Sequence, residues 1–148
     1  MFHLMWSFYQ ERKRMSDKSF VDSNIFLYAF SDKNKDKQII ASNLIQKNIM
    51  ISTQVVNEVS SNMIKKLKFD NSEIKDFIES CYARYTLVNF SQEVFVLACT
   101  LREKYSLSYY DSLIVSTALS SQSNILYSED MQHQLLIDKQ LTIINPFI

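Results

Sequence analysis

The chain has 148 residues, 47% of them hydrophobic and 22% charged, and its 16 basic side chains equal its 16 acidic ones. This length suits one domain with its own core and excludes two full domains, and zero net charge excludes a protein that coats nucleic acid by bulk attraction. The absence of glycine excludes the glycine-dependent phosphate loops.

The first segment, MFHLMWSFYQERKRM, differs from the rest of the chain. Its positive charges follow a short apolar part, the reverse of a secretory signal. We therefore expect a domain over 18–148 and an N-terminal extension over residues 1–17 that is either disordered or a mis-assigned start, with Met15 as the alternative first residue. Residues 1–14 should be dispensable for folding and activity, and a membrane-surface or partner-binding helix is the alternative for this segment. No apolar run reaches the length of about 18 residues that a membrane span needs, so we expect a cytoplasmic protein with no membrane partner.

Short apolar runs alternate with helical patterns along the domain. The expected strands cover residues 19–21, 49–51, 85–89, 124–127 and 141–144. The expected helices cover residues 25–30, 36–47, 53–67, 72–83, 91–105 and 108–121, the fourth of them capped by Ser72. This order predicts an α/β three-layer sandwich, with a short parallel sheet of four to five strands flanked by helices.

Two composition features predict local structure. Without glycine, turns with positive φ should use Asn, Asp or Ser, as in residues 31–34 and 121–124. Cys81 and Cys99 lack a CxxC spacing, which favours small buried hydrophobes in a reducing compartment over a disulfide or a metal site.

Four acidic residues lie near the ends of predicted elements. Asp22 follows the first strand directly, Glu58 lies early in the helix after the second strand, Asp111 lies in the first turn of the helix before the fourth strand, and Asp130 follows that strand. Ligands of open α/β sheets bind at the carboxyl ends of the strands. We therefore expect these four carboxylates to meet at one edge of the sheet.

Each acid also has a purely structural interpretation. Asp22 can form an Asx turn or cap the following helix, and Glu58 can be a solvated helix residue. Asp111 follows Ser108 at the spacing of a capping box, and Asp130 can occupy the first turn of a short helix. Individually, these alternatives stay open.

Several carboxylates close together repel one another, so that either their pKa values rise or a cation neutralises them. Oxygen ligands without Cys or His select Mg²⁺ or Mn²⁺ over zinc. Such ions bind phosphates and lower the pKa of a bound water, which is the chemistry of phosphodiester hydrolysis. The four acids together therefore predict a metal-dependent site.

Five motifs in order, FVDSNIFLYAF, ISTQVVNEV, LSYYDSLIVSTAL, ILYSEDMQH and IINPF, resemble a PIN domain of the kind found in VapC-type toxins. The resemblance runs from about residue 18 to 148. It implies a parallel sheet between helices, Mg²⁺-dependent endoribonuclease activity on RNA, a small antitoxin partner that blocks the site, and a homodimer.

The resemblance also implies roles for individual residues. Asp22 and Asp111 would be the principal metal ligands. Glu58 and Asp130 would complete the acidic pocket, and Asn24 and Ser128 match polar positions that arrange the ligands or the scissile phosphate.

The segment YSEDMQHQ raises three smaller questions. Glu129 adjoins Asp130, and the family pattern favours Asp130 as the residue that faces the metal. His133 is expected to be an exposed loop residue rather than a base. Relatives usually have glycine where this chain has Gln134, so the tip of this segment can differ in shape.

Water-mediated attack in line with the leaving oxygen would give a 5′-phosphate and a 3′-hydroxyl. Lys65, Lys66 and Lys68, with Arg102 and Lys104, can line the path of the RNA backbone, or the lysines can simply be a solvated helix end. Similarly, Tyr109 and Tyr110 can stack on unpaired bases or pack in the core.

Two other functions remain as alternatives. A non-catalytic PIN-like binding module would act through a protein or RNA partner. An aspartyl phosphatase or receiver domain would need a second acid beside Asp22 or two residues after it, where this chain has Val21, Ser23 and Asn24. That disfavours phosphoryl transfer.

Overall fold

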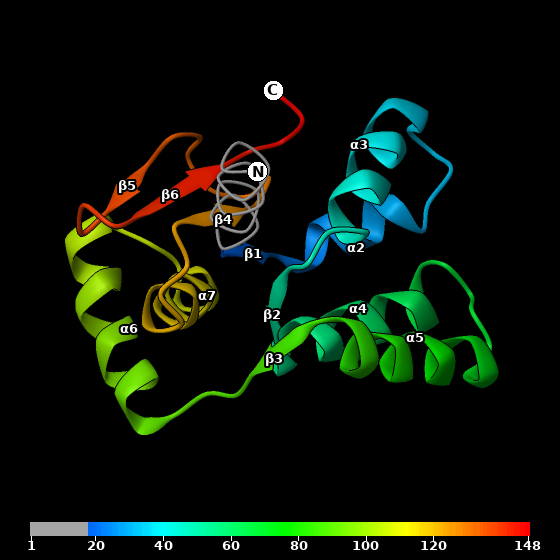
Figure 1. The fold of residues 1–148 in the computed structure, drawn as a ribbon, viewed down its shortest axis with the longest axis horizontal. Coiled ribbons are helices and arrows are strands. Elements are labelled where there is room, and N and C mark those ends of the chain that lie inside the picture. The colour runs from blue at the N-terminus through cyan, green and yellow to red at the C-terminus, as the bar shows by residue number, and fades with distance from the viewer. Residues whose placement is uncertain (1–17) are drawn as a thin grey trace, which may run out of the picture.

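The computed structural model describes residues 18–148, which form a sheet between two layers of helices (Figure 1). The strand order is β3-β2-β1-β4-β6-β5. All neighbouring strands are parallel except β5, which pairs antiparallel with β6. The strands are β1 (Ser19–Val21), β2 (Met50–Ser52), β3 (Thr86–Val88), β4 (Ile125–Tyr127), β5 (Leu136–Ile137) and β6 (Leu141–Ile144).

Three pairs of helices connect the parallel strands. The chain moves outward from β1 to β2 to β3 and then returns to β4 on the other side of β1, so right-handed crossovers put the third pair on the opposite face. In Figure 1, α6 and α7 accordingly lie on the left of the sheet and the other four helices on the right. The helices are α2 (Ser23–Ala29), α3 (Lys35–Ile45), α4 (Thr53–Lys65), α5 (Asn71–Arg84), α6 (Gln92–Tyr105) and α7 (Tyr109–Ser120).

The core explains why the central strands show little alternation of polar and apolar residues. Phe20 and Val21 of β1 and Ile51 of β2 are all fully buried, because helices cover both faces. The helix α7 is buried over Ser112–Ala118, including Ser116 and Thr117, whose hydroxyls donate to backbone carbonyls of Val94 and Leu113. The predicted three-layer α/β fold is therefore confirmed.

Some local predictions were wrong. The α5 helix is capped not by Ser72 but by Asp70, which forms a capping box with Glu73. The strand β5 was missed, because two residues are too few to show a period, so the sheet has six strands instead of four to five. Cys81 is buried as expected, but Cys99 is exposed.

Positive φ values occur mainly at residue types other than those predicted. Of the described residues, none in 31–34 has a positive φ, whereas Gln122 in the turn 121–124 has φ 61°. The complete set in the described part is Lys68, Ser106, Gln122, Gln134, Asp138 and Lys139. The chain thus accepts left-handed backbone at long polar side chains, at a cost of about 1 kcal/mol or more each.

The predictions for the extension 1–17 lie outside the described residues. Within residues 18–148, no helix is long and apolar enough to cross a membrane.

Candidate active site

Asp22 lies where β1 ends and is the N-cap of α2. Its Oδ1 accepts a hydrogen bond from the backbone N–H of Ser23 at 2.7 Å, and its Oδ2 accepts from the hydroxyl of Ser128 at 2.8 Å. The residue is only 6% exposed. Burial raises the pKa of Asp22 to about 6. The two hydrogen bonds lower this pKa, and the negative charges of Asp130 and Glu58 raise it.

The register of the sheet explains why Asp22 and Ser128 meet. Val21 of β1 is paired with Tyr127 of the parallel strand β4, so the next residue of each strand leaves the sheet at the same edge. The backbone N–H of Asp22 still donates to the carbonyl of Tyr127, and that of Ser128 to Ile144. Asp22 therefore has both a capping role and a place at the carboxyl edge, which the sequence left as alternatives.

Glu58 reaches the same place from α4. The hydroxyl of Ser23 donates to Glu58 Oε2 at 2.8 Å, and the side-chain amide of Gln54 donates to Oε1 at 3.0 Å. Glu58 is thus half-buried and oriented by two neighbours rather than solvated. Gln54 was not predicted as a site residue, although its spacing of four from Glu58 puts both on one face of the helix.

Asp111 lies in the first turn of α7, as predicted. Its backbone N–H donates to the hydroxyl of Ser108, which caps the helix. Burial raises the pKa of the half-buried Asp111 side chain, and the charges of Asp130 and Glu58 add to the increase, while the hydrogen bond from Ser108 opposes it. Ser108 therefore caps α7 through the backbone of Asp111, which is one half of the capping box considered for this helix. The role of the Asp111 carboxylate in the site stays a prediction.

Asp130 follows β4 in a turn rather than in a short helix. The side-chain amide of Asn24 donates to Asp130 Oδ2 at 2.9 Å, and the backbone N–H of Asp130 donates to the hydroxyl of Ser128 at 3.2 Å. Ser128 is fully buried and thereby links Asp22 to Asp130. Asn24 and Ser128 thus arrange the acids directly.

The charges of two of the acids act on the other two. Asp130 and Glu58 each raise the pKa of both Asp22 and Asp111. Among residues 18–148 the ion pairs are Lys37–Glu129 and Lys104–Asp138. None of the four acids therefore forms an ion pair with a basic side chain in this part of the chain. The structure therefore gathers negative charge at the carboxyl edge without neutralising it.

This donor set fits a hard divalent cation in its chemistry, since it consists of carboxylate oxygens without thiol or imidazole. The side chains do not form a closed ligand set, because among residues 18–148 no three His, Cys, Asp or Glu side chains form a group that could hold a metal ion. Several of their oxygens are instead turned toward Ser23, Ser128, Asn24 and Gln54.

Glu129 turns away from this site. It forms an ion pair with Lys37 and accepts a hydrogen bond at 2.6 Å from the hydroxyl of Tyr28. Burial alone would raise the pKa of Glu129, but the hydrogen bonds from Lys37 and Tyr28 outweigh it and lower the pKa. The Lys37 ammonium also lies 4.6 Å from the ring centre of Tyr28 and 5.2 Å from that of Phe147.

These contacts make a clamp, which we define as Tyr28, Lys37, Glu129 and Phe147. Of the two neighbouring acids, Asp130 interacts with Asp22 and Asp111, whereas Glu129 belongs to the clamp. The sequence alone did not single out Lys37, because nothing local relates residue 37 to residue 129.

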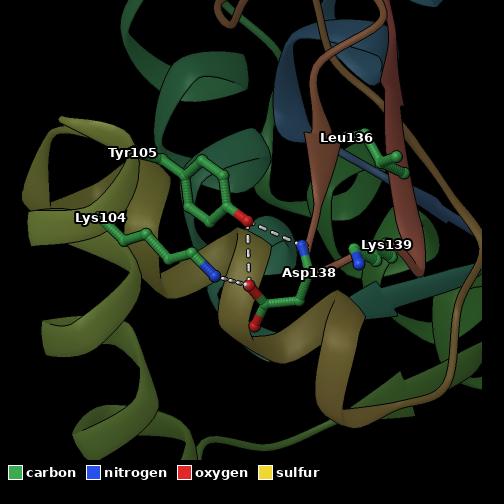
Figure 2. A pocket seen from close by; sticks show the side chains of 5 residues that line it. All are labelled: Lys104, Tyr105, Leu136, Asp138 and Lys139. Carbon is green, nitrogen blue, oxygen red and sulfur yellow. Dashed lines mark hydrogen bonds and ion pairs between the residues drawn. The ribbon is translucent and has the colours of Figure 1, made fainter.

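The basic residues considered for RNA binding are separated in space. Lys65, Lys66 and Lys68 are exposed at and just beyond the end of α4. Lys104, in contrast, lies beside the β5–β6 turn, where its ammonium donates to the Asp138 carboxylate at 2.7 Å. The Tyr105 hydroxyl binds the same carboxylate oxygen (Figure 2). That turn precedes β6, and hence lies at the amino edge of the sheet, opposite the acids.

The last two questions about YSEDMQHQ concern its end. His133 is half-buried, and its Nδ1 accepts a hydrogen bond from the backbone N–H of Asn145 at 3.0 Å, so it anchors the C-terminal segment rather than lying free in a loop. Gln134 has φ 66°, the conformation that glycine adopts most easily. The tip therefore keeps a glycine-like backbone without glycine.

Comparisons with known proteins agree with this fold. The family model of the PIN domain matches residues 19–136. Among curated proteins, none matches the chain significantly.

Solved structures share the fold at low sequence identity. A toxin–antitoxin complex from Klebsiella pneumoniae has a TM-score of 0.66 at 19% identity, covering 87% of this chain and 98% of the other. VapC20 of Mycobacterium tuberculosis, described as a sarcin–ricin loop cleaving toxin, has a TM-score of 0.62 at 12% identity, and the match covers 76% of this chain and 90% of the other. VapBC2 of Rickettsia felis, bound to a promoter DNA fragment, has a TM-score of 0.61 at 18% identity, and the match covers 84% of this chain and 96% of the other.

Proposed function

The chain belongs to the PIN domain family, and on that basis we propose that it is a Mg²⁺- or Mn²⁺-dependent endoribonuclease, the VapC-like toxin of a type II toxin–antitoxin pair. The observation that carries the proposal is the hydrogen-bond network at the carboxyl edge of the sheet, which joins Asp22, Glu58 and Asp130 through Ser23, Ser128 and Asn24. Asp111 lies close enough for the charges of Asp130 and Glu58 to raise its pKa. Among residues 18–148 none of these four acids forms an ion pair with a basic side chain. Repulsion between their negative charges therefore lowers the stability of the fold. Function explains why the fold keeps them.

Asp22 and Asp111 would hold the ion, and Glu58 and Asp130 would hold a second ion or a water molecule. When bound, the ion would neutralise the carboxylates and lower the pKa of a nearby water molecule. Ser23 and Gln54 each donate to one oxygen of Glu58, which leaves the remaining lone pairs available to accept a proton from that water.

The reaction is hydrolysis of an RNA phosphodiester. The water oxygen forms the new bond to phosphorus while the bond from phosphorus to the 3′ oxygen breaks. The departing oxygen takes up a proton, which leaves a 3′-hydroxyl and a 5′-phosphate. Asn24 and Ser128 fix Asp130 and Asp22 during this exchange, because their side chains hold these carboxylates in place.

The partners follow from the same proposal. A small antitoxin would cover the acidic edge, and the protein would act on RNA in the cytoplasm as a homodimer. Support comes from the shared fold of two structures, whose descriptions name a toxin–antitoxin complex and a toxin. Lys65, Lys66 and Lys68 remain candidates for contacts to the RNA backbone, because they are exposed and carry no ion pair among the described residues.

Induced expression with mapping of new RNA 5′ ends tests the activity and identifies the substrate together. We expect one set of 5′-phosphate ends with the wild-type chain and none with Asp111→Asn. Asp76→Asn is a matched control, because it removes an exposed carboxylate from α5 and should cleave normally. Equal cleavage by Asp111→Asn and the wild type would refute the proposal.

One observation favours the alternative of a non-catalytic binding module. Over residues 18–148 no three acids form a group that could hold a metal ion. Thermal melting with increasing Mg²⁺ or Mn²⁺ separates the two functions, since an ion that binds only the folded protein raises its melting temperature. A metal-dependent rise that Asp111→Asn removes supports the nuclease, and its absence in the wild type supports the binding module.

A further inference from the structure

Two neighbouring tyrosines at the start of α7 have exposed side chains. Tyr109 is 50% exposed and Tyr110 is 65% exposed, so neither packs in the core, and the core interpretation of this pair is wrong. Both lie in the first turn of α7, directly before Asp111. Rings this exposed add little to the hydrophobic core of the fold.

The tyrosine pair is held in a fixed position. Ser106 ends α6 with φ 54°, and only Leu107 and Ser108 separate it from α7, so the connection is a tight turn. The Ser108 hydroxyl accepts from the Asp111 N–H, and the Ser112 hydroxyl donates to the carbonyl of Tyr109. The first turn of α7 is therefore well ordered on both sides of the tyrosines.

The two rings also pack on each other. Their centres are 5.6 Å apart with an interplanar angle of 74°, an edge-to-face arrangement. Mutual contact restricts both side chains while most of their surface stays in water. A ring that is already ordered loses little entropy when a flat ligand stacks on it.

The charge of the site explains what such rings would contribute. An RNA phosphate that approaches Asp22, Glu58, Asp111 and Asp130 meets negative charge, and no described ion pair brings a cation to these acids. Besides the neutralising ion and the lysines proposed above, an attractive contribution that does not depend on charge would strengthen binding. Stacking of a base on an aromatic ring provides one, and is available only where the base is unpaired.

We propose that the Tyr109–Tyr110 pair is a stacking site for an unpaired nucleobase adjacent to the scissile phosphate, and that it selects single-stranded RNA. This inference rests on the proposed nuclease function, because it places the substrate against Asp111. Duplex RNA keeps its bases stacked internally and cannot use the site. The tyrosines act in binding and take no part in proton transfer.

Binding of a fluorescent 12-nucleotide single-stranded RNA of mixed sequence, followed by anisotropy in EDTA to prevent cleavage, tests the proposal. We expect Tyr110→Leu, and more strongly the double Leu variant, to weaken binding about 10-fold. Tyr110→Phe keeps the ring and should bind within about 2-fold of the wild type. Tyr82→Leu, which removes a 60% exposed ring from α5, is the matched control and should bind normally.

A second RNA with one abasic position sharpens the test. If the base and the ring interact, removing either one weakens binding, and removing both weakens it no further. Scanning the abasic position along the RNA identifies the stacked nucleotide. Additive effects at every position, or unchanged binding by the double Leu variant, would overturn the inference.

The outcomes also separate this inference from the proposed function. Normal binding of single-stranded RNA by the double Leu variant, with cleavage still lost in Asp111→Asn, would remove the stacking site and leave the nuclease. Ring-dependent RNA binding by a wild-type protein that does not cleave would retain the site and remove the nuclease. Melting temperatures of the Leu variants should equal that of the wild type, because the rings are exposed.

Discussion

Replacing Asp22 with asparagine should stabilise the metal-free protein at neutral pH. A pKa raised from its ordinary value of 3.8 to about 6 means that keeping Asp22 ionised in the fold costs about 3 kcal/mol, at about 1.4 kcal/mol per pKa unit. Asparagine removes the charge and can still accept the hydrogen bond from the Ser23 N–H. The asparagine loses the hydrogen bond from the Ser128 hydroxyl, and this loss offsets about 1 kcal/mol of the stability gained by removing the charge. The net gain expected at pH 8 is about 2 kcal/mol.

The sign of the pH dependence follows from the direction of the shift. Because the folded protein binds the Asp22 proton more tightly than the unfolded chain does, the cost is absent below pH 3.8, grows as pH rises, and is complete above about pH 6. At pH 4.5 about 1 kcal/mol of the cost remains. The advantage of Asp22→Asn should therefore fall to about zero between pH 8 and pH 4.5.

Thermal melts in EDTA at both pH values measure this difference. For a domain of this size, about 2 kcal/mol corresponds to a rise of roughly 4 to 10 °C at pH 8. Asp32→Asn, in the exposed loop before α3, is the control and should show no such pH-dependent gain. Saturating Mg²⁺ should raise the melting temperature of the wild type and not of Asp22→Asn. An advantage as large at pH 4.5 as at pH 8 would refute the electrostatic reasoning.

Three further predictions concern other parts of the chain. Lys37→Met should lower the cleavage rate about 10-fold without changing the fold, because it releases Glu129 and so makes the neighbouring Asp130 less ordered. Cleavage rates of this variant and of the control Lys33→Met, which removes an exposed lysine, check the prediction. Gln134→Gly should raise the free energy of unfolding in urea by about 1 kcal/mol, since φ is 66° there; a loss of stability would contradict this. In the folded protein a thiol reagent should label only exposed Cys99, because burial raises the pKa of Cys81 to about 12. Mass spectrometry detects the labelled residue.

The sequence predicted the fold well because the long helices and the buried parallel strands each have a strong local pattern. The predicted starts of α6 and α7, at residues 91 and 108, lie one residue before the observed ones, and Ser91 and Ser108 are the N-caps of these helices. The local pattern failed where two signals competed. At the start of α5, both Asp70 and Ser72 are good caps, and Glu73 decides between them because it can bond back to Asp70.

The placement of Asp22 and Asp130 followed from one topological rule, since residues after neighbouring parallel strands leave the sheet at the same edge. What that rule cannot give is the direction of each side chain. The Asn24 amide binds the Asp130 carboxylate, while Lys37 binds the carboxylate of its neighbour Glu129 in the clamp. Contacts between residues 24 and 130, or 37 and 129, depend on the packing of whole elements and leave no local pattern.

The same hydrogen bonds give the acidic site a second property. Ser23 donates to both Asp22 and Glu58, although the bond to Asp22 is long at 3.4 Å, and Ser128 donates to Asp22 while accepting from Asp130. Two hydroxyls thus satisfy carboxylate oxygens that would otherwise repel one another in a poorly solvated place. A bound cation would compete with these hydroxyls for the same oxygens. Affinity for the metal and stability of the metal-free fold are therefore opposed at Ser23 and Ser128, and removing either hydroxyl should change both in opposite directions.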